Sequence, residues 1–186
     1  MVCAHCGSQF EGRADARSCS ARCRVARHRA AARFAPKRMR DANRWVRHVA
    51  KRPVMPDGSS ASSTNPDTWS SYCVAVDSSV GDGAGFVLNG DGVMCVDLDD
   101  CVSDGVLSPW ANTILDLFPG AAVEVSLSGR GLHVWGLGPN VSKIVDVLGR
   151  RVEVYADKRY IAMTGTWLKS GELVDLTDGL RRMGIA

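Results

Sequence analysis

The sequence has no run of about 18 apolar residues, which is the length that a membrane-spanning helix needs. Its first residues are cysteines and polar residues, where a secretory signal would carry an apolar segment. No internal repeat is present. We therefore expect a cytoplasmic protein that does not enter a membrane and whose cysteines do not form structural disulfides.

Acidic residues are scarce in the first part of the chain. Residues 1–56 hold fourteen Lys/Arg against three Asp/Glu, whereas residues 57–186 hold nine against seventeen. A basic arm on a mildly acidic body indicates a polyanionic partner, most often nucleic acid. A membrane surface would be another such partner, but the arm lacks the apolar aromatic face that inserts into an interface.

Four of the seven cysteines lie within the first 23 residues, as Cys3-x2-Cys6 and, twelve residues later, Cys19-x3-Cys23. This spacing is typical of a four-thiolate zinc site, and a module of about 25 residues has too little core to fold without metal. The alternative is a set of unliganded thiols in a flexible tail. His5 or His28 would be a substitute ligand, although four thiolates are the simpler set.

An Arg/Ala-rich helix is expected from Ser20 to Phe34, with the second cysteine pair on its first turn. This helix would bind a nucleic-acid backbone through its basic side chains. The candidate contacts are Arg24, Arg27, Arg29 and Arg33. The alternative is a basic helix that is only solvated.

The composition predicts three regions: a zinc module with its basic helix at residues 1–35, a basic helix and linker at 36–66, and a core of alternating α and β elements at 67–186. In the second region, Trp45, Val46 and Val49 at roughly helical spacing predict that the helix runs over residues 37–52. The Ser/Pro/Gly-rich stretch from Pro53 to Pro66 then predicts a loop.

The third region alternates strand and helix patterns. We expect a hairpin of strands 85–88 and 93–99, a helix from Pro109 to about Phe118, and a hairpin of strands 123–127 and 132–135. A short helix over 141–148 and a last pair of strands, 152–155 and 160–164, complete the expected α/β sheet.

Asp97 and Asp99 follow an apolar run and would share one face of a strand, with Cα atoms about 6.5–7 Å apart. Carboxylates at that separation reach common or adjacent divalent ions, which also relieve the repulsion between them. The alternative is that Asp97, Asp99 and Asp100 simply end a strand at a solvated turn.

Two further stretches supply context for the acidic pair. The turn Ser126–His133 combines two hydroxyls, two glycines, an arginine and a histidine, and backbone N–H groups in such turns bind anions. An ordinary glycine-containing hairpin is the alternative. Glu153 lies between two valines on a strand, where it needs a partner, either a shared metal or a neighbouring arginine.

The chain carries, in this order, Asp97-x-Asp99, Ser128-Gly129-x-Gly131-Leu132-His133 and Glu153. This ordered set resembles the motifs of the archaeo-eukaryotic primase superfamily. More narrowly, the chain resembles the primase-polymerase (prim-pol) domain of phage and plasmid replication proteins, over about two-thirds of its length from about Trp45 to Gly165. Further pieces that match in order are Lys51-Arg52-Pro53, Asn65-Pro66-Asp67-Thr68-Trp69, Gly85-Phe86-Val87-Leu88, Arg159-Tyr160 and Thr164-Gly165.

The resemblance implies that Asp97, Asp99 and Glu153 hold two Mg²⁺ or Mn²⁺ ions and that His133 contacts the phosphates of the incoming nucleotide. Asp100 ranks below the other acids, and Asp157 is a weaker substitute for Glu153. The implied nucleotide contacts are Ser126, Ser128, Arg130, Lys51 and Arg159.

The implied fold is α+β: an RRM-like primase-polymerase core with an N-terminal α/β unit, preceded by the zinc module and basic helix. The implied function is synthesis of primers or short strands from nucleoside triphosphates on single-stranded DNA. No Gly-x-x-x-x-Gly-Lys-Ser/Thr loop occurs, so a replicative helicase would act in trans. The alternatives are a non-catalytic DNA-binding adaptor and a metal-dependent nuclease.

Overall fold

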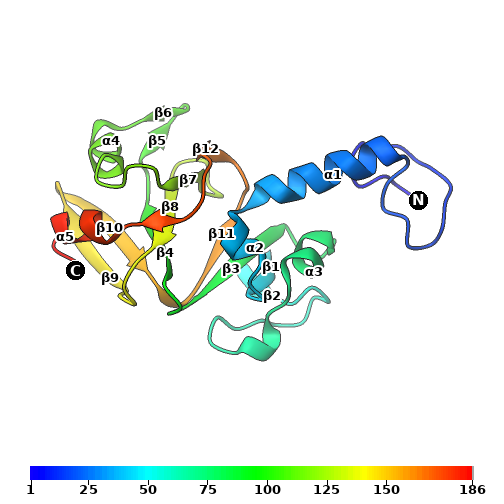
Figure 1. The fold of residues 1–186 in the computed structure, drawn as a ribbon, viewed down its shortest axis with the longest axis horizontal. Helices are drawn as coiled ribbons and strands as arrows, with labels where there is room; N and C mark the ends of the chain where they lie inside the picture. Colours follow the sequence, from blue (N-terminus) through cyan, green and yellow to red (C-terminus); the bar gives the residue numbers. More distant parts are fainter. Residues whose placement is uncertain (186) are drawn as a thin grey trace. The chain divides into compact units, whose positions relative to one another are not determined.

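The computed structural model describes residues 1–185, and the chain divides into two compact units, Met1–Ala35 and Pro36–Ala186. The fold is mixed α+β, with few helices and mostly antiparallel sheets (Figure 1), which confirms the expected class. Over residues 1–185, no helix has the length and apolar character needed to cross a membrane.

The first unit consists of a cysteine-bearing loop and the helix α1 (Ala21–Phe34). Ser20 caps the helix, because its hydroxyl accepts a hydrogen bond from the backbone N–H of Cys23 at 3.2 Å. In the loop, the backbone N–H of Cys3 donates to the carbonyl of Ser8, and Gly7 turns the chain at a φ of +72°. The helix predicted from Ser20 to Phe34 is therefore confirmed.

The second unit contains a seven-stranded sheet in the order β12-β7-β8-β4-β10-β9, with β13 added beside β8. Among the described residues, β13 and β8 form the one parallel pair, and the other pairs are antiparallel. The strands are β4 (Val93–Leu98), β7 (Ala122–Val125), β8 (Leu132–Leu137), β9 (Lys143–Val147), β10 (Arg150–Tyr155), β12 (Trp167–Lys169) and β13 (Val174–Asp175).

One face of this sheet carries the main hydrophobic core. Met94, Val96 and Leu98 point to this face from β4, and they pack with residues of α4 (Pro109–Leu115) and α5 (Thr177–Arg182). Each large apolar side chain buried here contributes about 1.5–3 kcal/mol. Because side chains alternate along a strand, Asp97 lies on the opposite face.

The second sheet has four strands in the order β11-β3-β1-β2. They are β11 (Asp157–Met163), β3 (Gly83–Asn89), β1 (Trp45–Val49) and β2 (Arg52–Val54). The fully buried Trp45 packs edge-on against Tyr72 and Phe86, and Phe86 in turn contacts Trp135 of the larger sheet. The remaining elements are α2 (Lys37–Arg40), α3 (Tyr72–Asp77), the 3₁₀ turn η1 (Pro66–Thr68) and the pair β5 (Val102–Ser103) and β6 (Val106–Leu107).

The helix predicted over residues 37–52 is wrong. Only the four residues of α2 are helical, and the segment that follows is β1. Strand β1 is central in its sheet, so its residues from Trp45 to His48 are buried on both faces. This continuous burial hides the alternation that marks a strand, and the apolar spacing then resembles a helix.

The predicted hairpin of strands 85–88 and 93–99 is also wrong in its pairing. Strands β3 and β4 both form, but β3 pairs with β1 and β11, whereas β4 pairs with β8 and β10. Likewise β10 and β11 belong to different sheets. The chain thus crosses between the sheets three times, after β3, β10 and β11. The first two crossings touch, because the N–H of Gly90 donates to the carbonyl of Ala156 at 2.9 Å.

The short helix predicted over 141–148 is instead the edge strand β9, which forms a hairpin with β10. Leu148 and Gly149 make the two-residue turn, both with positive φ, as a type I′ hairpin turn requires. The predicted hairpin of β7 and β8 and the helix α4, capped by Ser108, are confirmed.

Candidate functional site

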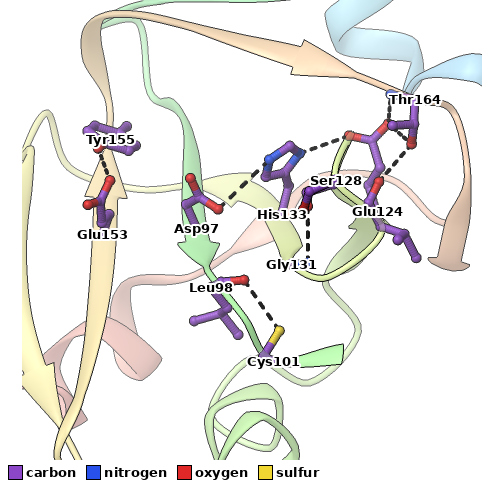
Figure 2. A network of polar contacts seen from close by, with 12 residues as sticks. Asp97, Leu98, Cys101, Glu124, Ser128, Gly131, His133, Glu153, Tyr155 and Thr164 are labelled. Atoms are coloured by element: carbon purple, nitrogen blue, oxygen red, sulfur yellow. Dashed lines mark hydrogen bonds and ion pairs between the residues drawn. The ribbon is translucent and has the colours of Figure 1, made fainter. Parts of the chain in front are cut away.

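Four charged or ionisable side chains form a row across the seven-stranded sheet, on the face opposite the main core. Glu153 of β10 is in register with Asp97 of β4, Asp97 with His133 of β8, and His133 with Glu124 of β7. Cross-strand partners point to the same side of a sheet. The four side chains therefore lie next to one another in this order, as Figure 2 shows.

Asp97 lies between Glu153 and His133 in this row, and its pKa is raised. Burial raises the pKa of its carboxyl, Asp99 and Glu153 raise it further, and His133 opposes them. His133 Nε2 lies 3.8 Å from Asp97 Oδ1, which is an ion-pair distance but too long for a hydrogen bond. Within residues 1–185, Asp97 Oδ1 is buried with no hydrogen-bond partner. Such an atom is costly unless a cation or donor meets it.

Asp99 is the first residue after β4, which ends at Leu98. Its side chain is exposed, and it lines the same cleft as Asp97. Asp97 and Asp99, which were expected on one strand, therefore lie on either side of the end of β4, and both line the same cleft.

Glu153 is held by neighbours on its own strand. Arg151 lies 2.5 Å from one carboxylate oxygen, and the hydroxyl of Tyr155 donates to the other. The guanidinium of Arg159 in turn lies 4.5 Å from the centre of the Tyr155 ring. The arginine that sequence considerations left open as a partner is therefore present. Glu153 is not among the residues that line the cleft.

The cleft has a volume of about 450 Å³ and lies between the two sheets. One wall comes from the seven-stranded sheet and carries acidic, hydroxyl and imidazole groups. The opposite wall comes from the four-stranded sheet and the loop beside it, and it carries basic groups. The first wall comprises Asp97, Asp99, Ser126, Leu127, Ser128 and His133, and the second comprises Lys51, Pro53, Ser63 and Lys158–Ala162.

The basic wall has an unusual backbone. Lys51 and Lys158 have φ values of 65° and 55°, in the left-handed region that non-glycine residues rarely adopt. Lys158 lies at an irregularity where β11 shifts register against β3, and Ser63 Oγ donates to its carbonyl at 3.0 Å. Strained backbone of this kind gathers at binding sites. Here it brings Lys51, Lys158 and Arg159 to one side of the cleft.

The loop between β7 and β8 is held by its own hydroxyls. Ser126 Oγ accepts from the N–H of Gly131 at 3.1 Å and lies 3.1 Å from Ser128 Oγ. Arg130, the remaining predicted nucleotide contact, does not line the cleft. It pairs instead with the exposed Asp100 at 3.1 Å.

Sequence considerations missed four residues of this region, namely Glu124, Lys158, Ser63 and Tyr160. The first had a signal, because Val123-Glu124-Val125 repeats the pattern of an acid between two valines that drew attention to Glu153. The others depend on how the two sheets meet, which no local pattern reports.

The cysteines of the first unit form a second site. The Sγ atoms of Cys3, Cys6, Cys19 and Cys23 all lie within 4.8 Å of one another. The separation is 3.6 Å between Cys6 and Cys19, and 3.5 Å between Cys19 and Cys23. Tetrahedral zinc with bonds of about 2.3 Å would set these sulfurs about 3.8 Å apart. The cluster is therefore compatible with zinc, and it is the one such group among residues 1–185.

The protein environment affects the thiols of this cluster differently and favours the thiolate of Cys3. The backbone N–H of Cys19 donates to Cys3 Sγ at 3.3 Å and is the main reason why the pKa of Cys3 is about 5. Contact with the Cys23 thiol instead raises the pKa of Cys19 to about 12. The Cys3 thiolate beside the protonated Cys19 thiol is a starting point for binding a soft cation, which releases the remaining proton.

Basic residues follow the cluster along α1, which has no acidic residue in its first turn. Arg24, Arg29 and Arg33 are exposed, and Arg27 is half-buried. The helix therefore presents guanidinium groups over much of its length.

The chain matches no model of a known protein family, and no curated protein shows significant sequence similarity to it. Any assignment of function therefore depends on the residues themselves.

Proposed function

We propose that this protein is a nucleotidyltransferase of the prim-pol type, which extends or primes DNA strands on a single-stranded template. One observation carries the proposal: Asp97, Asp99 and His133 open into the same cleft as Lys51, Lys158 and Arg159. Acidic groups on one wall and basic groups on the other suit a metal-bound triphosphate, which presents cations to one side and phosphate oxygens to the other.

The donor set fits Mg²⁺ or Mn²⁺. Asp97 offers a buried oxygen that lacks a partner within residues 1–185, and Asp99 offers an exposed carboxylate. Mg²⁺ commonly takes one or two protein carboxylates and fills its other positions with water and substrate phosphates. Two protein ligands are therefore enough to begin a site, with Glu153 as the third acid once Arg151 is displaced. Bound there, such ions make the 3′-hydroxyl a better nucleophile and neutralise charge on the departing pyrophosphate.

The residues of the chain provide orientation around this centre. His133 contacts the phosphates from the acidic wall. Lys51, Lys158 and Arg159 hold them from the basic wall, and the hydroxyls of Ser126 and Ser128 donate to phosphate oxygens beside His133. Fixed donors of this kind cost no reorganisation during the reaction, so they contribute mainly through positioning and charge.

The first unit would deliver the template. In this proposal, Cys3, Cys6, Cys19 and Cys23 hold zinc and thereby fix the start of α1, whose Arg24, Arg27, Arg29 and Arg33 contact the DNA backbone. A replicative helicase would supply the single-stranded template in trans. The seven-stranded sheet with α4 and α5 on one face would correspond to the RRM-like core, and the four-stranded sheet to the additional α/β unit.

A primer-synthesis assay tests the function. Full-length protein, single-stranded template and labelled ribo- or deoxyribonucleoside triphosphates are combined with Mg²⁺ or Mn²⁺. We expect labelled strands from the wild type and a loss of at least about 100-fold in Asp97→Asn and Asp99→Asn, since each removes a metal ligand. Asp116→Asn changes an exposed acid at the end of α4 and serves as the matched control.

The two alternative functions predict different results in the same assay. A metal-dependent nuclease would shorten the template rather than lengthen a strand. A DNA-binding adaptor would bind the template and incorporate nothing at any metal concentration. Equal product from the wild type and both aspartate variants would also reject the proposed site.

A further inference from the structure

Glu124 is a fully buried acid in β7, and all of its contacts are with donors. Oε1 lies 2.7 Å from the backbone N–H groups of both Thr164 and Gly165, and 3.2 Å from Thr164 Oγ1. Oε2 lies 3.3 Å from Trp135 Nε1, which can only donate. Donors on both oxygens favour the ionised carboxylate, which acts only as an acceptor.

The same Oε2 also lies 3.3 Å from Nδ1 of His133. A dashed line in Figure 2 marks this contact. Because this oxygen only accepts, Nδ1 of His133 must carry a proton to make the contact. The other ring nitrogen, Nε2, points to Asp97 and belongs to the cleft wall. Glu124 itself does not line the cleft, so it reaches any substrate only through His133.

We propose that Glu124 is a positioning residue that accepts a hydrogen bond from Nδ1 of His133 and thereby holds Nε2 of the ring toward the cleft. Its role in turnover rests on the proposed function of His133 as a phosphate contact. The hydrogen-bond arrangement itself is a property of the protein without substrate, and it is tested separately.

The effect of Glu124→Gln follows from the contacts. The amide has one oxygen and one NH₂ group, and the oxygen stays with Thr164 and Gly165, because those two backbone donors are fixed and closest. The NH₂ group then faces His133 Nδ1, which must accept. Nδ1 therefore carries no proton in the variant, and the ring has its proton on Nε2, the same change that follows when the acid of a Ser-His-Asp triad is replaced by its amide.

Long-range ¹H–¹⁵N spectra of full-length protein labelled at histidine measure this directly. The chain has four histidines, and the spectrum of His133→Gln identifies the signals of this one. We expect a protonated Nδ1 in the wild type and a protonated Nε2 with a bare Nδ1 in Glu124→Gln. Glu172→Gln makes the same chemical change at an exposed position and should leave the signals unchanged.

The inference is overturned if the wild type shows a bare Nδ1, or if Glu124→Gln keeps the wild-type pattern. The wild-type spectrum decides the matter even if the variant does not fold. In the primer-synthesis assay, we expect Glu124→Gln to lose about 10–100-fold in kcat, the range for partners that orient a functional group. Failure of the wild type to incorporate nucleotides would reject the proposed function and leave the histidine result standing.

Discussion

Asp97 of β4 lies directly opposite Glu153 of β10, so that two carboxylates are cross-strand neighbours on a largely buried sheet face. Arg151 and Tyr155 meet Glu153, but Asp97 Oδ1 has no hydrogen-bond partner within residues 1–185. The acidic row is therefore a place where the fold tolerates unfavourable charge, which is common where function competes with stability.

This arrangement predicts that Asp97→Asn stabilises the protein while it abolishes activity. Like charges placed opposite each other cost about 0.2–1 kcal/mol, and the amide removes one of them. For a domain of this size the gain corresponds to a rise in Tm of about 1–3 °C. Thermal unfolding without divalent ions measures it, with Asp116→Asn as the control. A clear fall in Tm would show that Asp97 supports the fold.

The basic wall predicts a separate effect on nucleotide binding. Lys51→Asn and Lys158→Asn remove a charge but keep a residue that tolerates positive φ. Losing one charged hydrogen bond to phosphate costs about 1.5–3 kcal/mol, so KM for the triphosphate should rise about 10-fold or more. Steady-state kinetics check this against Lys143→Asn on the edge strand β9. An unchanged KM in both cleft variants would remove these lysines from the site.

The cysteine cluster predicts that metal loss unfolds only the first unit. Cys6→Ser removes one of four ligands, so metal content should fall from about one zinc per chain to near zero. Amide exchange should become fast in residues 1–35 and stay slow in the strands of the second unit, which has its own core. Cys73→Ser, at an exposed cysteine in α3, is the control. Wild-type protein that binds no metal would contradict the assignment.

His48 predicts a loss of stability in mild acid. It is fully buried, neither ring nitrogen has a hydrogen-bond partner within residues 1–185, and burial lowers its pKa below 6.5. Below about pH 6.5, His48 binds a proton in the unfolded chain but stays neutral in the folded protein, so the fall in pH favours the unfolded state. The contribution of His48 is complete above that pH and decreases as the pH falls.

Denaturant unfolding at several pH values between 5 and 8 measures this effect. His48→Gln shifts stability by a similar amount at every pH, so the readout is the slope, which should be shallower than in the wild type. His28→Gln, at an exposed position on α1, should keep the wild-type slope. Parallel slopes for the wild type and His48→Gln would contradict the prediction.

The arginines of α1 predict a salt-dependent affinity for single-stranded DNA. Each phosphate contact contributes about −0.7 to the slope of log affinity against log salt concentration. Arg24→Gln combined with Arg29→Gln should therefore make the slope shallower by about 1.4. Fluorescence anisotropy with full-length protein measures it, and Arg182→Gln on α5 is the control. A slope that does not change would indicate that α1 is only a solvated helix.

Much of the local structure could be predicted from the sequence, because local rules govern it. The cysteine spacing gave the thiol cluster, Ser108-Pro109 gave the start of α4, and the glycine turn before His133 gave the β7–β8 hairpin. The alternation of side chains around Asp97 correctly predicted a strand there. Strand β4 ends at Leu98, one residue before the predicted end at Asp99.

Strand partners could not be predicted in the same way. The turn between β3 and β4 looks like a hairpin turn, yet the side chain of Arg44 binds Asn89 and Asp91 there while the strands diverge into different sheets. Such choices depend on contacts between distant segments. The basic wall was found only in part for the same reason, since Lys158 comes to the same wall as Lys51 through the strand order β11-β3-β1-β2 of the four-stranded sheet.

The late return of the chain to the four-stranded sheet at β11 also determines when the cleft can exist during synthesis. Its acidic wall comes from the middle of the second unit, whereas its basic wall combines residues before β3 with residues of β11, near the end. Strand β11 must pair with β3 before both walls are present, and long-range pairing of this kind is slow to form. A nascent chain released before residue 157 would carry the acidic row without its counterpart, so the site is completed only once β11 has been synthesised.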